Sequence, residues 1–142
     1  MTAIQLLLLP VLVQVALTLG LLFWLGPARV GALRRGEVRL KQVALGQNAW
    51  PDRITQISNA HNNQYQLPVL LYVLVLLALA LRMVDMVLVA CAWIFVGTRI
   101  AHAGIYVTSN NVPARFRAFV AGAVVLVVMW AWLALRILWE GA

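Results

Sequence analysis

Long apolar stretches separated by short polar connections dominate this chain. Residues 2–28 carry no charged side chain, whereas a helix needs only about 20 apolar residues to cross a hydrocarbon core of about 30 Å. The pattern predicts membrane spans at about residues 4–26, 56–81, 86–107 and 115–138. Because lipid cannot satisfy backbone polar groups, each span is expected to be a helix. We therefore expect an all-α membrane protein in which one four-helix bundle occupies residues 1–142.

Prolines and glycines modify this outline. Gly26 and Pro27 follow the first apolar run and are expected to end its helix. We interpret the run as a span and not as a cleaved signal peptide, because no basic residue precedes Ile4 and the run exceeds a usual signal core. Pro68 lies inside the second span, where we expect it to kink the helix.

Composition and charge agree with a membrane protein. The chain is 64% hydrophobic and only 11% charged, which lies far from the usual composition of a soluble domain. Its net charge of +7 is concentrated in two connections, 29–53 and the one before the fourth span. The positive-inside rule predicts that both connections are cytoplasmic and that both termini face the other side. We assign this charge to orientation and anionic lipid, with no nucleic-acid partner.

A run of amides leads directly into the second span. If this helix begins near Ile54, then Asn59, Asn63 and Gln66 follow at i, i+4 and i+7 and share one face. The third span carries a second polar stripe at its cytoplasmic end, with the side chains of Arg99, His102, Tyr106 and Asn110. Since the second helix enters from the cytoplasm and the third returns to it, we expect the two stripes to meet.

Two interpretations of these stripes compete. Amides and hydroxyls can simply hold helices together, at about 0.6 kcal/mol per hydrogen bond. An arginine inside a span, however, is costly unless it faces protein or water, and it marks a functional site by default. Arg99, His102 and Arg115 without an intramembrane acid favour an anionic ligand, held by charge-assisted hydrogen bonds.

Other chemistries have less support. Cys91 is the only cysteine, so the sequence predicts neither a disulfide framework nor a metal site. A proton-coupled transporter generally needs a carboxylate within a span. The four acids, in contrast, lie in or near the connections, at Glu37, Asp52, Asp85 and Glu140.

Two stretches carry a family resemblance. NQYQLPVLLY, at 63–72, followed by RIAHAGIYVTSNNVPAR, at 99–115, resembles the MAPEG family of membrane-associated proteins in eicosanoid and glutathione metabolism, and in particular its short bacterial members. The family has an asparagine, a glutamate three residues later and a proline in the second helix, where this chain has Asn63, Gln66 and Pro68. In the third helix, Arg99, His102 and Tyr106 match the family positions.

The resemblance implies a homotrimer in a bacterial inner membrane, with glutathione bound between neighbouring protomers near the cytoplasmic face. It further implies that this small anionic thiol is the substrate of a transferase or peroxidase acting on lipophilic electrophiles. Arg115 would be catalytic and would stabilise the thiolate, which is the nucleophilic form of the thiol. The expected glutathione-binding residues are Asn63, Gln66, Arg99, His102, Tyr106 and Asn110.

The chain also departs from the family pattern. Gln66 replaces a glutamate that holds a ligand's ammonium group in similar enzymes, and a neutral amide forms no ion pair. Phe116 and Phe119 follow Arg115 where some active relatives carry hydroxyl groups. These departures leave open a second function, that of a non-catalytic trimeric membrane protein that binds a lipid or a partner protein.

Overall fold

The computed structural model describes residues 1–44 and 49–140, and these residues form only helices, turns and irregular connections. Residues 45–48 of the basic connection and residues 141–142 lie outside the described residues. The elements in order are α1 (Ala3–Arg34), α2 (Leu40–Val43), α3 (Asp52–Asn62), η1 (Asn63–Tyr65), α4 (Leu67–Ala80), α5 (Met86–Val107) and α6 (Val112–Glu140). Four segments are long and apolar enough to cross a membrane, namely Ala3–Arg34, Asp52–Ala80, Met86–Val107 and Val112–Trp139. For the described residues, the prediction of an all-helical protein with four helices apolar enough to span a membrane is confirmed.

The first helix is longer than expected. It continues through Pro10 and Pro27 to Arg34, so the prediction that Gly26 and Pro27 end it is wrong. A proline removes one backbone donor, and a membrane helix tolerates this when its surroundings satisfy the freed carbonyl. The helix ends where Gly36 adopts a φ of 71°, the left-handed conformation that commonly terminates helices.

The second span is broken, not merely bent at its proline. Helix α3 tightens into the 3-10 turn η1, and Gln66 then leaves helical geometry with φ −101° and ψ −101° before α4 begins. The break therefore precedes Pro68, the residue at which we expected the kink. Proline has no N–H and crowds the residues before it, so a helix favours a restart with proline in its first turn, as Pro68 is in α4.

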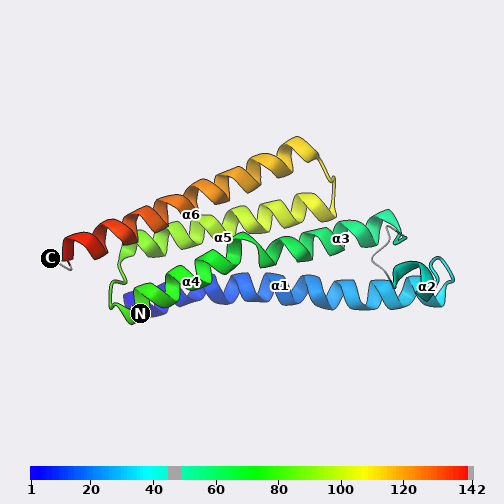
Figure 1. The fold of residues 1–142 in the computed structure, drawn as a ribbon, viewed down its shortest axis with the longest axis horizontal. Coiled ribbons are helices and arrows are strands. Elements are labelled where there is room, and N and C mark those ends of the chain that lie inside the picture. Colours follow the sequence, from blue (N-terminus) through cyan, green and yellow to red (C-terminus); the bar gives the residue numbers. More distant parts are fainter. Residues whose placement is uncertain (45–48, 141–142) are drawn as a thin grey trace.

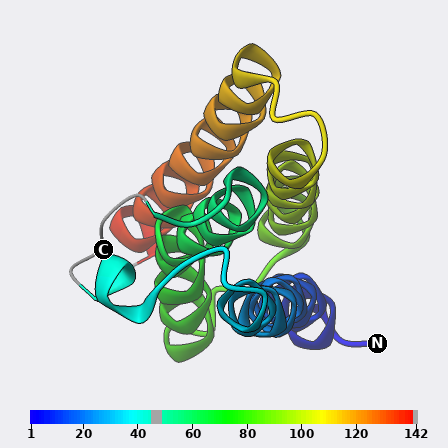
Figure 2. The same ribbon diagram turned by 90° about the vertical axis from the view of Figure 1, so that its right-hand side faces the viewer.

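The break redirects the second span across the bundle. Helix α3 packs against α1 and α5, whereas α4 packs against α1 and α6. Helix α5 lies beside α6, and the start of α1 and the end of α6 lie at the same end of the bundle (Figure 1). The view from the other end shows α6 crossing the remaining helices obliquely (Figure 2).

Two apolar clusters fill the interior. The cluster nearer the termini includes Leu74, Phe95 and Met129, all 0% exposed. The cluster at the other end joins α1, α3 and α5 and includes Leu25 and Ile57. The start of α6 contributes no buried residue to this second cluster. The polar side chains of the two predicted stripes lie between the start of α6 and the helices α3 and α5.

Candidate functional site

The polar stripes of the second and third spans meet beside the start of α6. A recess of about 170 Å³ opens there, and we call it the aromatic recess. It is lined by Asn63, His102, Tyr106, Val112, Arg115, Phe116 and Phe119. Four of the residues expected to bind or activate glutathione therefore share one recess, in the half of the bundle that also carries the basic connection (Figure 1).

A second recess of about 340 Å³ adjoins the first, and we call it the polar recess. Its lining consists of Asp52, Thr55, Gln56, Asn59, Tyr106, Asn110, Val112 and Arg115. Tyr106, Val112 and Arg115 line both recesses and so form their common wall. The two recesses can therefore hold the two ends of one elongated ligand, with Arg115 between them.

Arg115 is held in place from two sides. Its Nη1 donates to Asn110 Oδ1 over 2.6 Å, and its guanidinium lies 3.9 Å from the centre of the Tyr106 ring. A guanidinium over an aromatic face gains electrostatic stabilisation from the ring. These contacts leave Arg115 half-buried in the common wall, where it can donate to a bound anion.

Asn110 owes its place to the turn between α5 and α6. It has a φ of 49°, and its N–H donates to the carbonyl of Ile105 over 2.7 Å. Asparagine tolerates this left-handed conformation better than most residues. The same residue therefore shapes the turn and supplies the acceptor for Arg115.

His102 faces the aromatic recess from α5. Its side chain is only 3% exposed, and its ring contacts the Tyr106 ring edge-on, with centroids 5.5 Å apart. Within residues 1–44 and 49–140, its Nδ1 is buried and has no hydrogen-bond partner. A buried nitrogen without a partner is costly, so this atom is available to a molecule in the recess.

Arg99 lies behind the recess, in the interface between α5 and α6. Its side chain is 1% exposed, and its Nη2 donates to the carbonyls of Ala118 and Phe119 over 3.0 and 3.3 Å. The guanidinium lies between the rings of Phe95 and Phe119, at 5.4 and 5.5 Å. Arg99 therefore joins the two helices, although its Nη1 is buried and finds no partner in the described part of the chain.

Asn63 and Gln66 separate at the helix break. Asn63 lines the aromatic recess, and its Nδ2 donates to the carbonyl of Asn59 over 2.7 Å. Gln66 is exposed and lines neither recess. The expected common face of Asn59, Asn63 and Gln66 assumed an unbroken helix, and the turn η1 moves Gln66 off it.

Two further residues, Gln64 and Asp52, contribute to this region without having been predicted to do so. Gln64 is 2% exposed and bonds to Gln14 of α1, so it anchors the break from which Asn63 projects. Gln14 is an amide within the apolar first span, which signals a polar partner inside the bundle, whereas the run of amides around Gln64 does not single that residue out. Asp52 lines the polar recess, although we had assigned it only to a connection.

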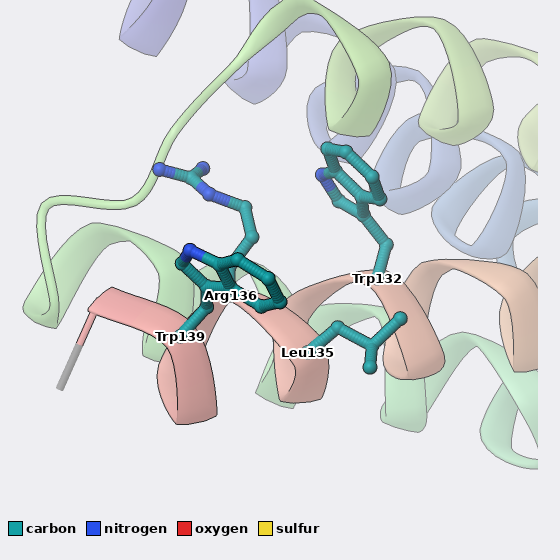
Figure 3. A pocket seen from close by; sticks show the side chains of 4 residues that line it. All are labelled: Trp132, Leu135, Arg136 and Trp139. Carbon is teal, nitrogen blue, oxygen red and sulfur yellow. The ribbon is translucent and has the colours of Figure 1, made fainter. Parts of the chain in front are cut away.

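Another recess lies at the opposite end of the bundle, between residues of α6. Figure 3 shows its lining of Trp132, Leu135, Arg136 and Trp139, and its volume is about 350 Å³. Its only cation, Arg136, donates to Asp85 Oδ2 over 2.8 Å and to the carbonyl of Met83 over 2.8 Å. Because this charge already has an anionic partner, we place the candidate site in the aromatic and polar recesses.

Metal chemistry has no evident ligand set here. In the described ranges 1–44 and 49–140, no three histidine, cysteine, aspartate or glutamate side chains gather as a metal ion would require.

Comparison with known proteins assigns most of the chain to one protein family. A sequence model of the MAPEG family matches residues 7–135. Neither the comparison with curated proteins nor that with solved structures found a significant match.

Proposed function

The chain belongs to the MAPEG family, and from this premise we propose that it binds glutathione in the two recesses and acts as a glutathione transferase or peroxidase on lipophilic electrophiles. The observation that carries the proposal is the convergence of Asn63, His102, Tyr106 and Arg115 on the aromatic recess. Family membership supports a membrane protein of glutathione or eicosanoid metabolism, and these residues suit an anionic thiol.

The chemistry requires a thiolate. A free cysteine thiol has a pKa of about 8.5, and nearby positive charge lowers it. Arg115 is oriented by Asn110 and Tyr106, so its guanidinium can stabilise the sulfur anion without first reorganising. The thiol proton leaves to solvent, and the sulfur then forms a bond to the electrophilic atom as the leaving group departs.

The lipophilic substrate would enter from the bilayer side. Phe116 and Phe119 line the aromatic recess together with Val112, and Phe116 is 66% exposed. An apolar wall that continues to the protein surface suits a substrate dissolved in lipid. The electrophile would then meet the thiolate beside Arg115.

We also propose that three copies assemble and that a neighbour completes the site. Gln66 is exposed on a single chain, and Arg99 Nη1 has no partner among the described residues. Both groups were expected to bind glutathione. Gln66 could do so if the ligand contacts two neighbouring protomers. Native mass spectrometry from mild detergent should give a trimer, and a monomeric species that still binds glutathione would contradict this.

The test of the enzyme proposal compares two arginines on α6. Arg115→Ala should reduce conjugation of glutathione to a halogenated nitrobenzene by about 100-fold, as expected for loss of a charge-stabilising donor. Arg117→Ala is the matched control, because Arg117 is exposed and lines neither recess. Wild-type protein that shows no glutathione binding, turnover or thermal stabilisation would reject the proposal.

A second function is favoured by the apolar wall and by Gln66. A non-catalytic trimer could hold a lipid chain against Val112, Phe116 and Phe119. Gln66→Glu distinguishes the two functions. In a glutathione site, the restored carboxylate should tighten glutathione binding, whereas in a lipid-binding trimer it should leave glutathione unbound.

A further inference from the structure

The polar recess is lined by one carboxylate and one guanidinium that do not pair with each other. Asp52 and Arg115 both line it. Within the described ranges, the carboxylate of Asp52 forms neither an ion pair nor a side-chain hydrogen bond, and Arg115 bonds to Asn110 instead. A recess with separated charges of opposite sign suits a ligand that carries both an ammonium and an anionic group.

The cation next to Asp52 in the chain is directed elsewhere. Arg53 donates to the carbonyl of Val107, and its guanidinium lies 5.1 Å from the centre of the Trp24 ring. These contacts tie α3 to α5 and α1, and they engage the side chain of Arg53 away from its neighbour. Arg53 therefore does not neutralise Asp52, which contributes a negative charge to the polar recess.

Amide groups follow Asp52 along the same face of α3. Gln56 and Asn59 stand four and seven residues after it, at the spacing of one helical face, and both line the polar recess. Their side-chain amides have no hydrogen-bond partner elsewhere in the described residues, so their N–H groups are free to donate. One face of α3 thus offers an acceptor for an ammonium and, beside it, donors for a carboxylate.

We propose that Asp52 binds the α-ammonium group of the γ-glutamyl end of the ligand, while Gln56 and Asn59 donate to the adjacent α-carboxylate. The cysteine end then lies in the aromatic recess, and the sulfur lies at Arg115 in the common wall. This assignment rests on the proposed glutathione function and deepens it, because it names a specificity-determining residue.

The test pairs one substitution with one change in the ligand. Equilibrium dialysis would measure binding of glutathione and of its desamino analogue, which lacks only the α-ammonium, to the detergent-solubilised full chain. Asp52→Asn should weaken glutathione binding about three- to tenfold, a modest loss because Asp52 is exposed. The analogue should bind wild type as weakly as glutathione binds the variant, and Asp52→Asn should not weaken it further.

Two further variants separate this role from general effects. Glu37→Gln changes an acid that lines neither recess and should leave both affinities unchanged. Gln56→Ala combined with Asn59→Ala should weaken both ligands equally, because both retain the α-carboxylate. An unchanged thermal midpoint in each variant would confirm that it folds.

The outcomes distinguish the two levels of the proposal. Equal affinity of wild type and Asp52→Asn for glutathione would overturn the role of Asp52 and leave the proposed function standing. An equal loss for both ligands in Asp52→Asn would also overturn it. Wild-type protein without affinity for glutathione would overturn the proposed function and this assignment together.

Discussion

The side-chain amide of Gln14 donates from Nε2 to Oε1 of Gln64 over 2.8 Å, and both residues are buried. Gln64 in turn donates to the carbonyl of Ala60 over 2.8 Å. The pair joins the middle of α1 to the turn η1, next to Asn63. It therefore ties the break in the second span to α1.

The first prediction concerns the stability of this pair. Gln64→Leu should lower the free energy of unfolding by about 1–2 kcal/mol, because the buried amide of Gln14 loses its partner. Replacing both residues by leucine should cost less than the sum of the two single changes, since no unpaired amide remains. The measurement is unfolding in mixed detergent micelles, and strictly additive losses would show that the two amides do not interact.

The sequence predicted the main parts of the fold and some of its site for clear physical reasons. Apolar length alone defined four spans, and helical spacing brought His102 and Tyr106 to one face, because α5 is a regular helix from Met86 to Val107. Gln66 leaves helical geometry at the break after η1, so helical spacing could not place it.

Burial was harder to predict than spacing. Arg99 shares the stripe of His102, yet its guanidinium turns to the α6 carbonyls of Ala118 and Phe119. These hydrogen bonds depend on how closely α6 approaches α5, and no local sequence pattern encodes that distance. The place of Asp52 in the polar recess likewise depends on the turn between α5 and α6 lying beside the start of α3.

The second prediction concerns Asp85, outside the spans. Burial opposes its ionisation, but the N–H of Leu88, the indole of Trp132 and the charge of Arg136 outweigh burial, so the pKa of Asp85 lies below its ordinary value. An aspartate has a pKa of about 3.9 in the unfolded chain. The ionised carboxylate therefore stabilises the fold above that pH, and this stabilisation is lost as the pH falls through the lower folded pKa.

Asp85→Asn should therefore be less stable than wild type at pH 6, with a difference that shrinks below about pH 4. Thermal unfolding followed from pH 6 to pH 3 measures this directly. Glu37→Gln is the control, because the Arg35–Glu37 pair of 2.6 Å lies on the surface and surface pairs contribute little. A constant difference between wild type and Asp85→Asn across this range would contradict the prediction.

The third prediction concerns the close approach of α5 and α6. A Cβ added at Gly122 would overlap the guanidinium of Arg99 and the hydroxyl of Thr98. Gly122→Ala should therefore destabilise the fold by about 1–3 kcal/mol, the usual cost of overpacking. Gly20→Ala is the control, since nothing lies within 4 Å of the added carbon, and alanine is the better helix former.

A second background identifies the cause of that loss. If the guanidinium is the obstacle, Gly122→Ala should cost clearly less in a chain that already carries Arg99→Ala, because the crowded group has been removed. The free energy of unfolding in mixed micelles gives all four values of this cycle. The same cost in both backgrounds would show that Arg99 is not what excludes a side chain at Gly122.

The fourth prediction separates the two roles of Asn110. Asn110→Gly keeps the left-handed turn, because glycine adopts a positive φ without strain, but it removes the acceptor that holds Arg115. Asn110→Ala removes the acceptor and also strains the turn at φ 49°. The glycine variant should therefore retain wild-type stability, while the alanine variant should lose about 1 kcal/mol.

On the proposed function, both Asn110 variants should lose activity to a similar extent, by about three- to tenfold in kcat/KM for glutathione conjugation, because Arg115 loses the acceptor that holds it. The pH profile provides the sharper readout. With a less ordered guanidinium, the thiol pKa rises toward its free value of about 8.5, so the rate should reach its plateau at a higher pH than in wild type. An unchanged pH profile in Asn110→Gly, despite normal folding, would show that Asn110 shapes the turn but does not position Arg115 for catalysis.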